Sequence, residues 1–149
     1  MRLALLLALT ATPALAASRD GATVLMPTDA RMRATWEDWG FAEAVVRGDT
    51  VYLSGVVAGL RPGETDPAAA YDRAFRTIGS ILERAGSSWD DVLDMTTYHT
   101  DVTAQFEAFR DVRKRYVKAP YPTWTAIDID RLIPEGGLVE IKVIAQKKR

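Results

Sequence analysis

The segment AEAVVRGDTVYLSGVV, residues 42–57, predicts how the fold begins. Two runs rich in valine and other β-forming residues flank Gly48–Asp49, a two-residue turn pair that accepts positive φ angles. β-branched and aromatic side chains favour extended backbone because they pack well on a pleated surface. We therefore expect an antiparallel hairpin that opens a β-sheet.

Two amphipathic helices are expected downstream of this hairpin. The first has Asp66 in the N-cap position, Pro67 at its first helical position and Gly86 just past its end. Its apolar stripe recurs at helical spacing and consists of Ala70, Tyr71, Ala74, Phe75, Ile78, Ile81, Leu82 and Ala85. The second helix covers residues 103–117, and the prolines that follow stop it.

Three further strands are expected at residues 91–100, 123–129 and 138–146. The order β-β-α-β-α-β-β predicts an α+β fold in which both helices pack on one face of a single sheet. The other face would be bare and partly apolar, so we expect it to contact further copies of the chain. Residues 17–27 are expected to form an exposed lead-in, and residues 27–40 a short helix capped by Thr28 or Asp29.

The N-terminus has the features of a signal peptide. Arg2 precedes the apolar run of residues 3–11, and Ala14-Leu15-Ala16 has the small-x-small pattern of a cleavage site. We expect cleavage after Ala16 and a periplasmic or secreted protein, with residues 17–40 as an N-terminal extension. The apolar run is too short to span a bilayer, so no stable membrane association is expected.

Charge and composition exclude several classes of function. Removal of the first sixteen residues takes away Arg2 and leaves 18 basic residues against 20 acidic ones, which argues against a nucleic-acid partner. The basic run at residues 110–118, which includes Arg113, is interpreted as the solvated face of a helix. The chain contains no cysteine, so disulfides and thiolate ligands are excluded.

Glu140 and Ser54 are the candidate catalytic residues. Glu140 interrupts the apolar run GLVEIKVIA, and it is either a surface carboxylate that faces Lys142 or a group that holds or deprotonates a water at a subunit boundary. The Ser54 hydroxyl either hydrogen-bonds a ligand or is tied to the adjoining turn; without a neighbouring base it is a poor nucleophile. His99 is the only histidine, so no multi-histidine metal site is expected within one subunit, and a structural or rim position is favoured. No metal or other cofactor is expected.

Three segments together resemble the Rid family of reactive intermediate deaminases, also called the YjgF or endoribonuclease L-PSP family. They are GDTVYLSGVV at 48–57, ILERAGSSWDDVLDMTTYHTD at 81–101 and AIDIDRLIPEGGLVEIKVIA at 126–145. The resemblance runs from Phe41 to Ala145 and defines a domain at residues 41–149. It implies a chorismate-mutase-like fold, a homotrimer with a central β-barrel, and ligand clefts between adjacent subunits.

Two positions depart from the family pattern that the resemblance supplies. Members that hydrolyse 2-imino acids carry an arginine in a Pro-x-Arg-Ser/Thr segment, and Pro122-Thr123-Trp124-Thr125 has Trp124 at that position. The tyrosine of the Gly-Pro-Tyr-Ser pattern is matched by Phe41, whereas Ser54 and Glu140 match the family serine and late glutamate.

The resemblance therefore implies that Trp124, Thr125 and Phe41 line the cleft. An indole cannot replace the two charge-assisted bonds of an arginine to a carboxylate, so an anionic imino acid would bind weakly. Arg61, in the loop after Ser54, is a candidate substitute cation. Two functions remain open: an exported hydrolase of imines or enamines other than simple 2-imino carboxylates, and a noncatalytic trimer that binds aromatic or amine metabolites.

Overall fold

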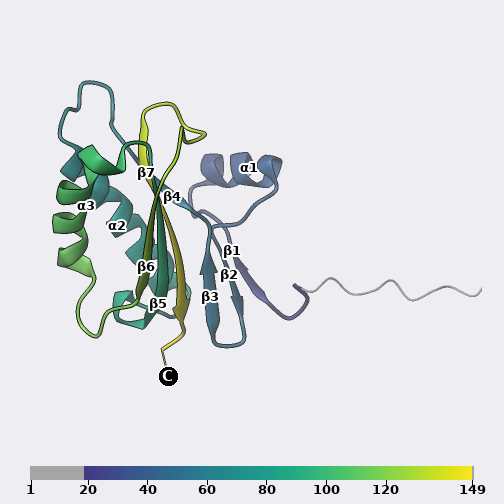
Figure 1. Ribbon diagram of the computed structural model, residues 1–149. Coiled ribbons are helices and arrows are strands. Elements are labelled where there is room, and N and C mark those ends of the chain that lie inside the picture. The colour runs from purple at the N-terminus through teal and green to yellow at the C-terminus, as the bar shows by residue number, and fades with distance from the viewer. Residues whose placement is uncertain (1–18, 149) are drawn as a thin grey trace, which may run out of the picture.

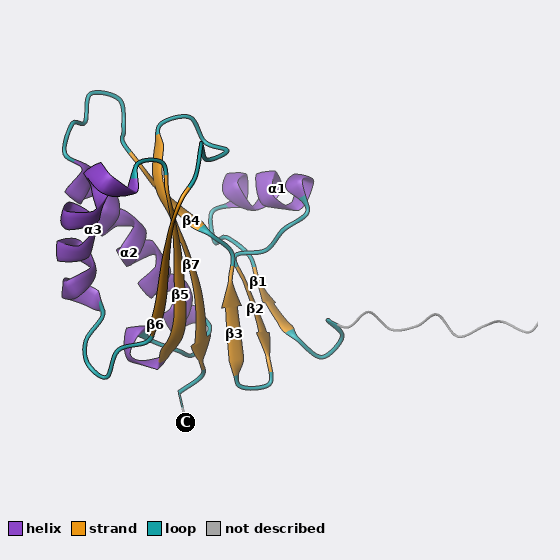
Figure 2. Ribbon diagram, in the orientation of Figure 1, coloured by secondary structure: helices purple, strands orange, loops and turns teal. Residues whose placement is uncertain are grey.

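Seven strands form one mixed sheet in the computed structural model, which describes residues 19–148 (Figures 1 and 2). The strands are β1 (Thr23–Leu25), β2 (Ala44–Arg47), β3 (Thr50–Leu53), β4 (Val56–Gly59), β5 (Val92–His99), β6 (Thr123–Asp128) and β7 (Gly137–Gln146). They are hydrogen-bonded in the order β1-β2-β3-β7-β5-β6, and β4 also pairs with β7. Only β5 and β6 run parallel to each other. The α+β prediction is confirmed.

The helices begin and end close to the residues that the sequence indicates. They are α1 (Ala30–Trp39), α2 (Pro67–Arg84) and α3 (Val102–Tyr116), with a 3-10 turn, η1, at Trp89–Asp91. Asp29, Asp66 and Asp101 each cap a helix by accepting a hydrogen bond from a backbone N–H of its first turn. The helices α2 and α3 lie side by side against the sheet, whereas α1 lies beyond β4 in the view of Figure 1.

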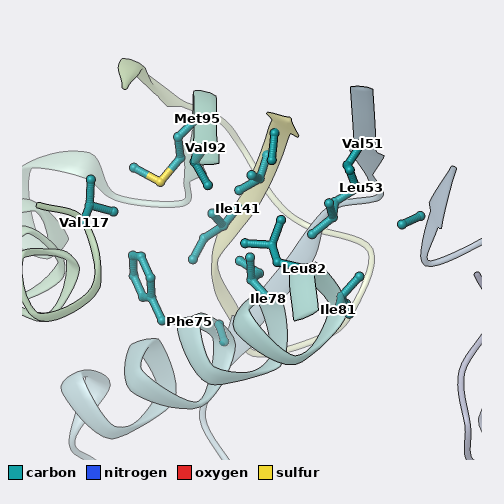
Figure 3. Close-up of a cluster of buried hydrophobic side chains, with 14 of the residues drawn as sticks. Val51, Leu53, Phe75, Ile78, Ile81, Leu82, Val92, Met95, Val117 and Ile141 are labelled. Carbon is teal, nitrogen blue, oxygen red and sulfur yellow. The ribbon is translucent and has the colours of Figure 1, made fainter. Parts of the chain in front are cut away.

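The core lies between α2 and one face of the sheet. Phe75, Ile78 and Leu82 of α2 point toward Met95 and Ile141 of the central strands (Figure 3). Along β7 the burial alternates, and Val139, Ile141, Val143 and Ala145 all face the helices. This alternation leaves Glu140 and Lys142 on the opposite face, as predicted.

The open face of the sheet exposes apolar side chains. Tyr52 of β3 is 49% exposed and Ile127 of β6 is 40% exposed. Their partners on the neighbouring strands, Ile144 and Tyr98, do not cover them. Exposed apolar area of this kind is typical of a surface that another chain covers. Coverage by further copies of the chain stays a prediction.

The N-terminal segment differs from the expected exposed lead-in. Thr23–Leu25 pairs with β2 as an antiparallel strand, and the side chain of Leu25 is buried. The Arg84 guanidinium also binds this segment by donating to the backbone carbonyl of Met26 at 2.5 Å. A three-residue strand is too short to show periodicity, so no local pattern marks it. The expected signal peptide at residues 1–16 lies outside the described residues.

The second β-rich run of the hairpin, residues 50–57, contributes to two strands, β3 and β4. β3 pairs with residues 144–146 of β7, and β4 pairs with residues 137–141 of the same strand. Ser54 and Gly55 lie between β3 and β4 and belong to neither strand. The interruption puts this dipeptide beside the Glu140 side chain. None of the helices formed within residues 19–148 combines the length and apolar character needed to cross a bilayer.

Candidate functional site

The fold brings Glu140 directly over Gly55. A Cβ built on Gly55 would overlap the Glu140 carboxylate, and its three nearest neighbours would all be atoms of that side chain. Gly55 is not among the glycines with positive φ, so its backbone conformation does not by itself require glycine. A side chain at position 55 would have to displace the end of the Glu140 side chain, because the carboxylate occupies that space.

Ser54 is held in place by the chain on which it lies. Its Oγ donates a hydrogen bond to the carbonyl of Ala42 at 2.6 Å, and its backbone N–H donates to the carbonyl of Glu43 at 2.9 Å. The hydroxyl proton is therefore committed, but the oxygen keeps lone pairs that can accept from a ligand N–H. The geometry suits an orienting acceptor and does not suit a nucleophile.

The Glu140 carboxylate is available for chemistry. Its side chain is half-buried, and within residues 19–148 it forms no hydrogen bond or ion pair with another side chain. Lys142 shares the sheet face of Glu140, as the surface-carboxylate alternative expects, but the two side chains form no ion pair. An unpaired carboxylate beside a fixed hydroxyl is a candidate site for water or a ligand.

A hollow of about 620 Å³, called the polar hollow below because it contains the charged side chains of Arg131 and Lys142, extends from this carboxylate over the open face of the sheet. Besides Ser54, Gly55 and Glu140, its lining is mixed. Apolar residues such as Leu53, Ile129 and Leu132 alternate with polar ones, which are Tyr52, Tyr98, Arg131 and Lys142. Arg131 and Lys142 are both exposed. Arg131 was not among the predicted site residues, because nothing in the turn-rich segment around it distinguishes it from a solvated loop residue.

An aromatic pocket of about 570 Å³ meets the same carboxylate from the other side. Its walls include Met32, Trp36 and Trp39 of α1 together with Phe41 and the β4 residues Val56 and Val57. Ser54, Gly55, Ile133 and Glu140 line both this pocket and the polar hollow. Glu140 thus stands where a polar and an apolar compartment join.

Comparison with known proteins decides the family. The family model described as Endoribonuclease L-PSP matches residues 36–147, which is most of the chain. The chain belongs to the endoribonuclease L-PSP (Rid) family. The resemblance found in the three sequence segments is confirmed.

Two relatives and one solved structure illustrate the similarity. RutC family protein YjgH of Escherichia coli (strain K12) is 36% identical over 109 residues, covering 71% of this chain and 82% of that protein. The 2-iminobutanoate/2-iminopropanoate deaminase of Capra hircus is 34% identical over 110 residues, covering 70% and 78%. The solved structure of protein YJGH superposes with a TM-score of 0.72 at 32% identity, covering 85% of this chain and 97% of that chain.

The structure places the Trp124 indole under α3. Its Nε1 donates to the Thr97 hydroxyl at 3.1 Å, and its ring is parallel to that of Phe106 at 5.7 Å. The guanidinium of Arg113 lies 4.3 Å from the ring centroid, a cation–π contact. Within one chain the indole lines neither compartment that contains Glu140. A cleft shared by Trp124 and Glu140 would require a neighbouring subunit, as the family resemblance implies.

Of the three other predicted ligand contacts, only Phe41 lines a compartment that contains Glu140. Thr125 is exposed on β6 and points to the open face, opposite to its neighbour Trp124. Arg61 lines a separate pocket near the start of α2, with Asp66 and Asp72. Thr125 and Arg61 therefore line neither compartment of the site within one chain, whereas Phe41 lines the aromatic pocket together with Glu140.

The interpretation of Arg113 as part of a solvated helix face is wrong. Arg113 is only 9% exposed, because its side chain lies across the indole of Trp124, and burial lowers the pKa of its guanidinium. Its Nε atom has no hydrogen-bond partner among the described residues. Long arginine stems often cover apolar surface in this way. The signal in the sequence was the spacing of Arg113 from Phe106 and Phe109 on one side of α3.

His99 has a structural position. Its side chain is fully buried under α3, with Nε2 3.0 Å from the Thr97 hydroxyl and Nδ1 3.3 Å from the Gln105 side-chain oxygen. Burial lowers the pKa of its imidazole. Thr97 therefore joins His99 and Trp124 in one network. Across the part of the chain that the structure describes, no three His, Cys, Asp or Glu side chains gather into a metal-binding group.

Proposed function

We propose that this L-PSP family member hydrolyses imines or enamines of small molecules at the site formed by Ser54, Gly55 and Glu140. The reaction adds water across the C=N bond of the substrate. The carbon takes the oxygen, the nitrogen takes the protons, and the products are a carbonyl compound and ammonia. The deaminase relative named above supports this reaction class for the present chain.

The unpaired carboxylate of Glu140 is the observation that carries the proposal. Glu140 accepts a hydrogen bond from the attacking water and takes its proton as the C–O bond forms. The Ser54 oxygen accepts from the imine N–H, since its own proton is committed to Ala42. Gly55 leaves the space in which the carboxylate and the substrate carbon meet.

We propose that simple 2-imino carboxylates are poor substrates. The arginine position carries Trp124, whose N–H is used by Thr97, and Glu140 repels a second carboxylate in the same site. Arg131 and Lys142 line the polar hollow, but both are exposed, and water screens their attraction for an anion. The absence of an arginine does not weaken the binding of a neutral imine, because such a substrate has no carboxylate for it to bind.

Ammonia release from two imines of equal chain length tests this charge preference. An amine oxidase acting on propylamine generates the imine of propanal, and an amino acid oxidase acting on alanine generates 2-iminopropanoate. We expect the chain to accelerate ammonia release from the neutral imine at least about tenfold more than from the anionic one. Faster hydrolysis of 2-iminopropanoate would show that the inference from Trp124 is wrong.

A noncatalytic small-molecule-binding trimer is the second candidate. The observation that favours it is the aromatic pocket, which offers far more apolar wall than imine hydrolysis requires. A binding protein of this kind would show a rise in melting temperature with phenethylamine, and it would leave the hydrolysis rate of every imine at its spontaneous value.

We also propose that the chain works outside the cytoplasm as a homotrimer. The signal-peptide pattern of residues 1–16 supports export, and the exposed apolar face with Tyr52 and Ile127 supports self-association. Intact-mass measurement on periplasmic material should give a chain that begins at Ala17. A chain that still carries Met1 in that fraction would contradict cleavage.

A further inference from the structure

We propose that α1 and Phe41 form a specificity pocket for an aromatic side group of the substrate, next to the reacting carbon. The inference rests on the proposed function, because it takes Glu140 and Ser54 as the reactive end of the ligand site. It adds the chemical class of the group that fills the second compartment.

The turn at the end of α1 holds the aromatic side chains of the pocket together. Gly40 adopts a left-handed conformation with φ 76°, and the backbone N–H of Phe41 donates to the carbonyl of Trp36 at 3.1 Å. This turn brings the Phe41 ring onto the Trp36 ring, with centroids 4.3 Å apart and planes inclined by 28°. The Trp39 ring centroid lies 6.3 Å from that of Phe41. Three rings therefore gather where one helix ends.

The rest of the pocket offers little that would bind a charged group. Val56, Val57 and Ile81 add apolar wall. Glu43 also lines the pocket, but its carboxylate is paired with the Arg84 guanidinium at 2.5 Å. The free charge in the compartment is thus that of Glu140, at its junction with the polar hollow.

The α1 side chains that line the pocket are exposed, so a ligand that covers them would gain binding free energy. Trp39 is 62% exposed and Met32 is 49% exposed, although both line the pocket. A flat apolar group that enters between them removes apolar surface from water and makes ring–ring contacts. A pocket of about 570 Å³ has room for one aromatic ring and its linker to the imine carbon.

The test compares an aromatic and an aliphatic imine in the same enzyme. The substrates are the imines of phenylacetaldehyde and of propanal, generated by an amine oxidase from phenethylamine and propylamine. We expect Trp39→Ala to lower the ratio of the two kcat/KM values, aromatic over aliphatic, about tenfold. Trp39 is largely exposed, so its removal should leave the fold intact, and circular dichroism checks that α1 remains helical.

Tyr121→Ala is the matched control. Tyr121 is an exposed aromatic residue that lines neither compartment of the site, and its removal should leave the ratio unchanged. An unchanged ratio in both Trp39→Ala and Met32→Ala would overturn the specificity pocket while the deaminase proposal stands.

A binding measurement separates the pocket from the chemistry. Calorimetric titration with phenethylamine and with propylamine should show tighter binding of the aromatic amine, and Trp39→Ala should remove about tenfold of that preference. If no imine is hydrolysed but this preference is found and lost in Trp39→Ala, the pocket stands and the deaminase proposal fails. Equal affinity of the wild type for both amines would overturn the pocket.

Discussion

Gly55 and Glu140 share one volume: the carboxylate of Glu140 fills the space that a side chain on Gly55 would need. A Cβ at position 55 would lie 2.6 Å from the carboxyl carbon, well inside van der Waals contact. The residue at position 55 and the candidate catalytic group thus depend on each other for space.

A double-mutant cycle measures this dependence. Gly55→Ala should lower the free energy of unfolding by about 1 kcal/mol, because the new methyl group must displace the Glu140 side chain from this space. In a Glu140→Ala background the same substitution should cost less than about 0.5 kcal/mol, since every colliding atom is gone. Urea unfolding gives all four values. Equal costs in both backgrounds would show that the collision is absent in solution.

Trp124 should contribute to stability through its contacts under α3. Trp124→Ala removes the hydrogen bond to Thr97, the stack on Phe106 and the support of the Arg113 guanidinium. Because the indole is half-buried, we expect a loss of about 2–4 kcal/mol in the free energy of unfolding. The control Tyr121→Ala, at an exposed aromatic residue, should change it by less than about 0.5 kcal/mol. Similar values for both variants would exclude a structural role for Trp124.

His99 predicts a dependence of stability on pH. Its pKa is lowered in the folded chain, chiefly by burial, while Gln105 and Asp128 act in the opposite direction. The unfolded chain binds a proton at the ordinary imidazole pKa of 6.5, and the folded chain binds it only at lower pH. The stabilisation is therefore complete above that pH and declines as the pH falls. We expect the free energy of unfolding to drop between about pH 7.5 and 5.5, and this drop to shrink in His99→Gln. An equal drop in the variant would assign it to other groups.

Self-association through the open sheet face is directly measurable. Light scattering on a sizing column should give a mass three times that of one chain. Tyr52→Glu puts a charge on the exposed apolar face and should shift the population toward monomer. A wild-type chain that elutes as a monomer at micromolar concentration would contradict the trimer.

Local signals predicted most of the fold. Asp29 and Asp66 mark helix starts because capping is a contact within four residues, and Gly48 marks the hairpin turn for the same reason. The strand β1 was missed, since its three residues are ordered by pairing with β2 and by Arg84, which is distant in sequence. Tertiary contacts of this kind leave no local pattern.

The candidate site was predictable only in part. Glu140 and Ser54 stood out because each is a polar residue in or beside an apolar strand, and the structure brings them together. The contact between Gly55 and Glu140 was not predicted, because the two residues are far apart in sequence and only the fold brings them together. The α1 helix was expected. The position of Trp36 and Trp39 in the pocket wall was not, because it depends on the turn at Gly40.

The central claim is that the Glu140 carboxylate activates water for imine hydrolysis, and Glu140→Gln tests it most directly. The substitution keeps the size of the side chain above Gly55 and removes its basicity. Ammonia release from the imine of phenylacetaldehyde should be accelerated by the wild type and fall at least about a hundredfold in the variant, with an unchanged melting curve. Activity of a folded Glu140→Gln variant within about twofold of the wild type would contradict this role of Glu140.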